Sequence, residues 1–314
     1  FVLHSNGAVD YTVDWGDGSS SQTSTSNALS HTYSAGTYTI NISSDIAYGP
    51  DFNAIPADVT QINSVEIEAG IDLGSTLANA WYNGTNITSF VCAASATSNV
   101  TNFSNAWRGC PLTSFPLINT SQGTNFYAAW NGCTALTSFP AIDTSSGTNF
   151  NSTWANCSAL TSFPALVLSG GTNFSSTWLN NYALASFPAL DLSGSAIFSS
   201  AWKSCTSLTT FGAADVSNGT SFSQAWYGCT SLTTFPANMF DTATLSTFVS
   251  AWTNCALTAI SIENILVSLD TNGTSSISLS LSGGTNAAYS TWTTDAVDAY
   301  DSLINKSWTI SYNT

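Results

Sequence analysis

Six of the seven cysteines recur at nearly regular spacing, and they are the residues of this chain with the most obvious capacity for chemistry. Cys92 lies outside the register, and Asn181 stands where a regular spacing would place another cysteine. If successive repeats stack, neighbouring cysteines could come within disulfide reach; the alternative is a row of small buried thiols that fills one core position. We favour the row, because an identical residue in each repeat suits uniform packing and a pairing scheme would tolerate Asn181 badly. The recurring cysteines are Cys110, Cys133, Cys157, Cys205, Cys229 and Cys255.

Carboxylates and histidines give weaker signals. Asp143, Asp191 and Asp215 each follow a tryptophan by thirteen residues, and Asp14 and Asp17 each lie next to a glycine or one residue from it. Both patterns favour turn or cap acceptors, with calcium binding as the minor alternative. Two histidines and no Cys-x-x-Cys motif argue against a metal centre and a catalytic triad. Polysaccharide hydrolysis needs a close pair of carboxylates, and none recurs, so we predict a protein that is not an enzyme and has no cofactor.

One tryptophan returns every 23 to 26 residues from Trp81 to Trp252, and this period sets the frame for every other side chain. Such a period is typical of a stacked-repeat solenoid, in which each repeat buries its apolar face against its neighbours. Phe, Trp and Cys stand at i, i+4 and i+7, which is one face of a helix, so we expect a short helix of about two turns in each repeat. The predicted structural core includes Trp107, Trp130, Trp154, Trp178, Trp202, Trp226, Trp252, Cys133, Cys157 and Cys229.

The stretch Leu-Thr-Ser-Phe-Pro-Ala, which follows the cysteine, is short and partly apolar and favours a strand, with proline at its end or at a bulge. We therefore expect an α/β solenoid over residues 51–260: a right-handed, leucine-rich-repeat-like coil of about eight 24-residue repeats with a parallel sheet. Threonines that alternate with buried Leu and Phe would face outward from this sheet. The candidate ligand-binding residues on that exposed face are Thr137, Thr161, Thr209 and Thr233.

The repeat frame, Ala-Trp-x-x-Cys-x-x-Leu-Thr-Ser-Phe-Pro-Ala-x-Asp, covers about residues 77–260 and resembles the BspA-type leucine-rich repeat of bacterial surface proteins. That family carries Met-Phe where this chain carries Ala-Trp. The resemblance implies the solenoid fold. It leaves the function open, because such repeats occur in adhesins and in phage structural proteins alike.

The two ends depart from the repeat. In residues 1–50, Trp-Gly-Asp-Gly and His-Thr-Tyr-Ser-Ala-Gly-Thr-Tyr, with a shortened spacer before the second Tyr, resemble the PKD-type immunoglobulin-like module of extracellular proteins, which implies a small β module. Residues 261–314 predict an α/β capping domain, and about 50 of these residues are similar to the endings of repeat proteins in bacteriophage virions. Its predicted helices span 261–273 and 294–305, and its predicted strands span 276–282 and 308–312.

Composition narrows the classes of partner. Lys and Arg total 3 against 18 acidic residues, and the formal net charge is −15. This balance argues against nucleic-acid binding, which needs basic patches, and against anionic membrane surfaces. No run of 18 apolar residues is present, so we expect no membrane insertion in this portion. Because the chain begins at Phe1 without a secretory signal, we interpret it as part of a longer extracellular protein.

These observations lead to three functional hypotheses. The first is a non-catalytic recognition module of a bacteriophage virion, such as a tail-fibre, receptor-binding or head-decoration protein, that binds a host-surface glycan or protein. The second is a bacterial cell-surface adhesin built on the same repeats. The third is a self-assembling structural fibre subunit, whose partners would be other virion proteins or copies of itself. Repeat proteins of this kind work as extended binding surfaces.

Overall fold

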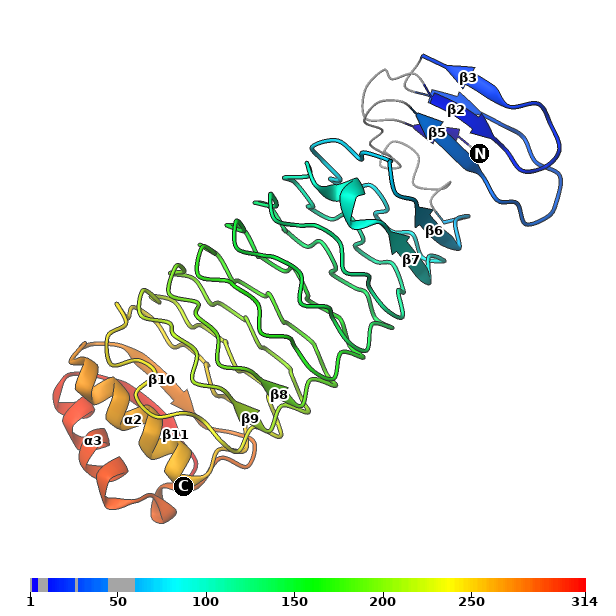
Figure 1. The fold of residues 1–314 in the computed structure, drawn as a ribbon. Helices are drawn as coiled ribbons and strands as arrows, with labels where there is room; N and C mark the ends of the chain where they lie inside the picture. The colour runs from blue at the N-terminus through cyan, green and yellow to red at the C-terminus, as the bar shows by residue number, and fades with distance from the viewer. Residues whose placement is uncertain (1, 5–10, 26–27, 45–59) are drawn as a thin grey trace.

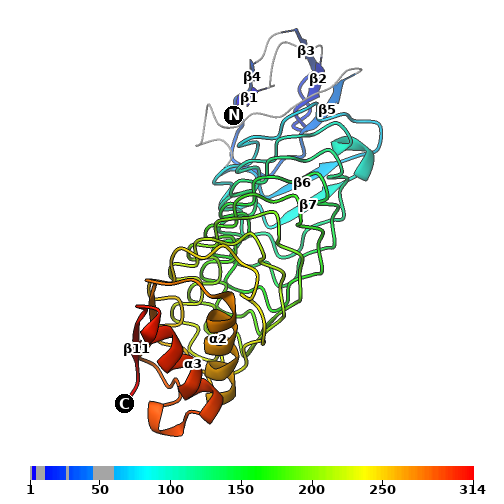
Figure 2. The same cartoon turned by 90° about the vertical axis from the view of Figure 1, so that its left-hand side faces the viewer.

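The computed structural model describes residues 2–4, 11–25, 28–44 and 60–314. Its shape is an elongated rod, with a small group of strands at one end and two helices at the other (Figure 1). Between them the chain winds in successive coils that lie on top of one another, as a view turned by a quarter also shows (Figure 2).

The N-terminal strands form two small antiparallel sheets. Strand β1 (Val2–His4) pairs with β4 (Ala28–Ser30), and β2 (Tyr11–Asp14) lies between β3 (Gln22–Ser24) and β5 (Asn41–Ser44). Alternation along β2 buries Tyr11, Val13 and, just beyond it, Trp15. The domain boundary predicted at residue 50 lies outside the described residues.

Each coil is joined to the next by parallel backbone pairing. Strand β6 (Ser64–Ile67) pairs with β7 (Ser89–Cys92), and a short 3-10 helix, η1 (Ala94–Thr97), follows. Further along, a run of single parallel bridges links residues 23 to 26 apart. They run from Thr76 through Asn102, Asn125, Asn149, Asn173, Ile197 and Ser221 to Thr247.

The prediction of a short helix in each repeat is wrong. In the described residues, α-helices occur only as α2 and α3, near the C-terminus. The residues two positions before and two after each tryptophan have positive φ, for example Ala128 at 50° and Gly132 at 80° around Trp130. A left-handed residue at every fourth position interrupts the right-handed backbone that an α-helix needs. The Phe, Trp and Cys side chains at positions i, i+4 and i+7 nevertheless point inward, as predicted.

Alternating backbone N–H groups explain why this turn suits a stack. The N–H groups of Phe126 and Trp130 donate to Asn149 and Thr153 of the next coil, at 2.9 Å each. The N–H groups of Ala129 and Asn131, on either side of Trp130, bond within the coil, to the carbonyls of Phe126 and Ala128 at 3.1 and 3.2 Å. About half of the backbone N–H groups of this turn therefore find their acceptors within the coil, and the other half find them in the next coil.

The strand predicted over Leu-Thr-Ser-Phe-Pro-Ala forms at three of the equivalent positions. They are β7, in the segment that follows Trp81, and β8 (Ser186–Phe187) and β9 (Thr210–Phe211), which pair in parallel. Proline has no N–H and cannot donate to a ladder. After β9 the proline is replaced by Gly212, whose N–H donates to the Phe187 carbonyl at 2.9 Å. Proline thus limits the sheet, as at Pro188, which directly follows β8.

Aromatic rings fill the interior along the whole stack. The indoles from Trp81 to Trp252 lie on one another with centroids 5.0 to 6.1 Å apart. Phenylalanines meet them edge-on, as Phe139 meets Trp130 at 4.8 Å. The indole N–H groups of the seven tryptophans from Trp107 to Trp252 have no acceptor, so ring packing, not hydrogen bonding, holds these side chains.

An α/β unit closes the C-terminal end. Helix α2 (Ala259–Asn272) packs on α3 (Thr294–Asn305), and β10 (Ser278–Leu281) pairs in parallel with β11 (Thr309–Tyr312); a short 3-10 helix, η2 (Tyr289–Thr291), precedes α3. The predicted helices and strands of this region are confirmed to within two residues. Within the described ranges no helix has the length and apolar character to cross a membrane.

Candidate functional site

The four threonines predicted to bind a ligand are all exposed, and they lie along one side of the stack. Their hydroxyl groups also link coils. Those of Thr161 and Thr233 donate to the carbonyls of Thr137 and Thr209, each at 3.2 Å, and Thr209 donates to the Ala185 carbonyl at 3.2 Å. Three of the four hydroxyl protons are therefore already engaged in holding the stack together.

A row of asparagines on another side was not singled out from the sequence. One asparagine immediately precedes the inward phenylalanine in each of four successive coils, and adjacent members form parallel bridges. Each side-chain oxygen accepts the backbone N–H two residues later, at 2.9 to 3.2 Å. The recurring Asn-Phe dipeptide was the available signal. We call this set the asparagine row; it comprises Asn102, Asn125, Asn149 and Asn173.

The recurring cysteines form a column of buried thiols, and all seven are free. Each recurring thiol donates to the carbonyl of the tryptophan one coil earlier, at 3.1 to 3.3 Å. Burial raises the pKa of Cys157 and Cys205 to about 12. Thiols that stay protonated are poor nucleophiles and poor metal ligands, so this column serves packing. Asn181, buried in the coil without a cysteine, accepts the Cys157 N–H at 2.9 Å.

Asp143, Asp191 and Asp215 cap turns. The N–H groups of Ser145, Ser193 and Ser217 donate to them at 2.9 to 3.0 Å. Hydroxyl bonds of 2.6 Å from the first two serines lower the pKa of Asp143 and Asp191. Within the described ranges no group of three or more His, Cys, Asp or Glu side chains could hold a metal ion.

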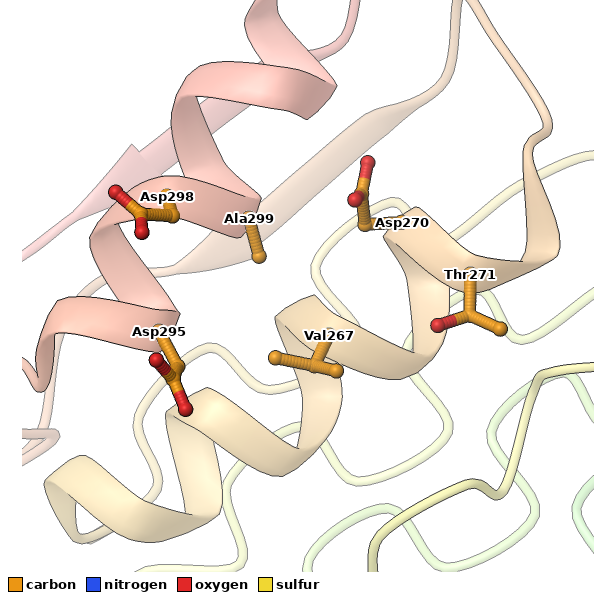
Figure 3. Close-up of a pocket in the computed structure, with 6 residues that line it drawn as sticks. All are labelled: Val267, Asp270, Thr271, Asp295, Asp298 and Ala299. Carbon is orange, nitrogen blue, oxygen red and sulfur yellow. The ribbon is translucent and has the colours of Figure 1, made fainter.

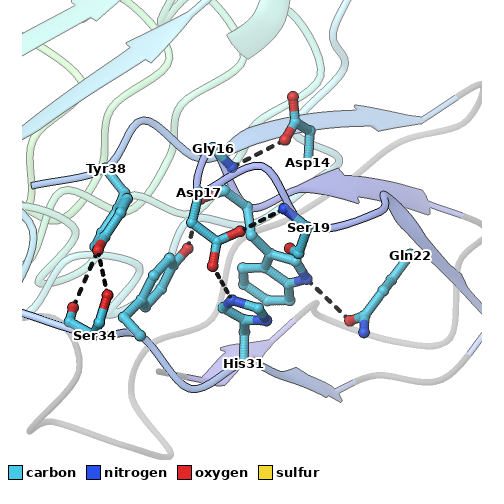
Figure 4. A network of polar contacts seen from close by, with 10 residues as sticks. Asp14, Gly16, Asp17, Ser19, Gln22, His31, Ser34 and Tyr38 are labelled. Carbon is cyan, nitrogen blue, oxygen red and sulfur yellow. Dashed lines mark hydrogen bonds and ion pairs between the residues drawn. The ribbon is translucent and has the colours of Figure 1, made fainter. Parts of the chain in front are cut away.

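In the N-terminal module, Asp17 organises a network of polar and aromatic groups (Figure 4). His31 Nε2 lies 2.7 Å from Asp17 Oδ2, and the Ser19 N–H donates to the same carboxylate at 3.0 Å. Hydrogen bonds from Ser19 and then from His31 hold the pKa of Asp17 well below its usual range. The His31 ring stacks on Trp15 at 4.9 Å, and the Tyr33 hydroxyl donates to the Trp15 carbonyl at 2.9 Å. These contacts fix the loop after β2.

A shallow depression of about 310 Å³ lies between α2 and α3 (Figure 3). Asp270 pairs with Lys306 at 2.7 Å, and the two carboxylates of α3 lie across from α2 in the figure. The depression is lined by Val267, Asp270, Thr271, Asp295, Asp298 and Ala299.

Charge is divided unevenly along the chain. Residues 1–72 carry nine acidic and no basic side chains, residues 73–240 carry three acidic and two basic, and residues 241–314 carry six acidic and one basic. The two cations of the middle segment are engaged with tyrosine rings: Arg108 lies 5.5 Å from the Tyr82 centroid, and Lys203 lies 5.1 Å from that of Tyr227. The coils thus present nearly uncharged sides between two acidic ends.

No protein-family model matches this sequence, and no curated protein is similar enough to count as a relative.

Proposed function

We propose that this chain is a non-catalytic recognition module displayed on a bacteriophage virion, where it binds a glycan or protein of the host surface. The observation that carries the proposal is the long stack of coils with repeated, outward polar side chains and almost no net charge. A surface of this kind offers one ligand many similar contacts along its length, which is how repeat proteins bind. On this proposal the stack is a leucine-rich-repeat-like solenoid.

The chemistry of the titratable groups supports binding over catalysis. The cysteine thiols are buried and donate to carbonyls, Asp143 and Asp191 are held by serines, and Asp17 is held by Ser19 and His31. Each of these groups is explained by a structural contact.

A binding assay on intact bacteria tests the proposal. The fluorescently labelled chain is mixed with a panel of bacterial strains, and cell-associated fluorescence is measured against protein concentration. We expect saturable binding to some strains and not to others, with no release of sugar from the cells. Binding to none of the strains, or enzymatic release of sugar, would contradict the proposed function.

A further inference from the structure

We propose that the asparagine row is the ligand-contacting element of the stack and that its ligand is a neutral polysaccharide lying along the rod. This inference rests on the proposed function and names its site and ligand class.

The side-chain amides of the row have a fixed orientation. The oxygen of Asn125 accepts the Tyr127 N–H at 3.1 Å, and the oxygen of Asn149 accepts the Asn151 N–H at 3.2 Å. Because the oxygen turns toward its own backbone, the NH₂ group is directed away from that bond. None of the four NH₂ groups has an acceptor anywhere in the described ranges, and all four side chains are partly exposed. The row therefore offers preorganised donors.

Neighbouring hydroxyl groups lack this freedom. The threonines that directly precede Asn125 and Asn149 donate to the carbonyls of the coil before, Thr124 to Thr101 at 3.3 Å and Thr148 to Thr124 at 3.1 Å. Three of the four threonines on the other side of the stack, Thr161, Thr209 and Thr233, are engaged in the same way. Four successive unoccupied donors thus distinguish the asparagine row from the threonine face predicted from the sequence, where most hydroxyl protons are engaged.

The row has definite ends. Thr76 occupies the bridging position before Asn102, and Ile197 occupies it after Asn173. With about 4.8 Å between paired strands, the four amides span about 14 Å. Tyr127 lies beside Asn125 with 39% of its surface exposed, which adds an aromatic face with a polar tip. A ligand of this site must carry acceptors at several places along its length and an apolar face for the tyrosine.

The low net charge of the middle segment favours a neutral ligand. The middle segment, residues 73–240, carries one net negative charge, and its two cations are engaged with tyrosine rings. An anionic polymer would find no free cation there, and a cationic one would prefer the acidic ends. A neutral polysaccharide has hydroxyl and ring oxygens that can accept hydrogen bonds from the asparagine row, and it has apolar ring faces that can pack on Tyr127.

Isosteric substitutions separate this row from the threonine face. In Asn125→Asp/Asn149→Asp the acceptor oxygen of each turn is kept and the two NH₂ donors are removed. The matched control, Ser138→Asp/Ser162→Asp, places the same charges at exposed positions on the threonine face. Retardation in gels containing purified neutral glucan, mannan or galactan measures binding, with hyaluronate as the anionic counterpart.

We expect the wild type and the control to be retarded by at least one neutral polysaccharide and not by hyaluronate, and the asparagine variant to bind it about tenfold more weakly or worse. Tyr127→Ser, which installs the residue found at the equivalent Ser104 and Ser175, should also weaken binding while leaving the thermal midpoint nearly unchanged. The Tyr127→Ser variant still tests the proposal if Asn125→Asp/Asn149→Asp folds poorly.

Three results would overturn the inference: no retardation of the wild type by any neutral polysaccharide, equal binding by the asparagine variant, or loss of binding in the control alone. Binding to bacteria that survives periodate but is lost after protease treatment of the cells would identify a protein receptor. In that case the proposed recognition function would stand and the polysaccharide assignment would fail.

Discussion

The thiol of Cys157 donates a hydrogen bond to the backbone carbonyl of Trp130, 27 residues earlier, across 3.2 Å. The bond joins two successive coils at the centre of the rod, and the other five recurring cysteines repeat it. At the C-terminal end, Asn286 takes over the same function, because its side-chain NH₂ donates to the Trp252 carbonyl at 3.0 Å. One core position thus links every coil that carries the recurring cysteine to the coil before it and also closes the stack.

Buried, protonated thiols should resist modification in the folded protein. Burial raises the pKa of Cys110, Cys157, Cys205 and Cys255 to about 12, and a thiol reagent attacks the thiolate. At pH 8 we expect almost no labelling of the native protein by a disulfide reagent and seven labelled cysteines in denaturant. Rapid labelling of several native cysteines would contradict this core.

Removal of one stacked indole should strongly destabilise the rod. Trp154 is fully buried between Trp130 and Trp178, so Trp154→Ala leaves a cavity and should cost about 3–5 kcal/mol of unfolding free energy. The exposed change Ser162→Ala should alter stability by less than about 0.5 kcal/mol. Chemical denaturation of both variants measures the difference, and similar stabilities would show that the indoles do not form the core.

Two turn carboxylates should make the rod sensitive to acid. The folded-state pKa values of Asp143 and Asp191 are lowered from 3.8 by their serine partners. Their contribution to stability is therefore complete above that value and is lost as the pH falls through the folded-state pKa. In Asp143→Asn/Asp191→Asn the turns should persist, because Asn119 makes the same bonds to Ser121 at 2.8 and 3.0 Å.

Thermal unfolding between pH 7 and pH 2 checks this prediction. Wild type and variant should melt at similar temperatures at pH 7, and the variant should lose less stability below pH 4. A variant that is much less stable at pH 7, or one that follows the wild-type curve into acid, would show that these carboxylates do not act in this way.

The sequence predicts which side chains lie in the core better than it predicts the backbone conformation between them. The regular tryptophan spacing predicts one shared place for the indoles, and Trp154 indeed lies between its two neighbours in the stack. The helix was wrong because an alternation of right- and left-handed residues also brings i and i+4 to the same side. Only φ values such as the 50° of Ala128 reveal it, and alanine gives no warning of such a conformation.

The threonine and asparagine rows show the same limit at the surface. Exposure of Thr161 follows from its alternation with buried residues, but the bond of its hydroxyl to Thr137 depends on the stacking register. Asn149 stands next to an inward phenylalanine, but its bridge to Asn173 also depends on that register. At the C-terminal cap, Thr258 and Thr293 begin helices by accepting N–H groups of the first turn. There local sequence predicted both helices to within two residues, because capping depends on neighbours within three residues.

Completing the cysteine column should stabilise the protein. Asn181 occupies the cysteine position of its coil, and its side-chain NH₂ is buried without an acceptor, which costs about 1–3 kcal/mol. In Asn181→Cys the new thiol can donate to the carbonyl of Trp154, as Cys205 does to that of Trp178 at 3.2 Å. The Cys157 N–H, which loses its present acceptor, can turn to the Trp154 carbonyl, as the Cys133 N–H does to that of Trp130.

We expect Asn181→Cys to gain about 1–2 kcal/mol of unfolding free energy, measured by chemical denaturation. Asn181→Ala supplies no donor and leaves a small cavity, so it should gain less or lose stability. A less stable Asn181→Cys variant would show that the amide makes a net favourable contribution where it stands.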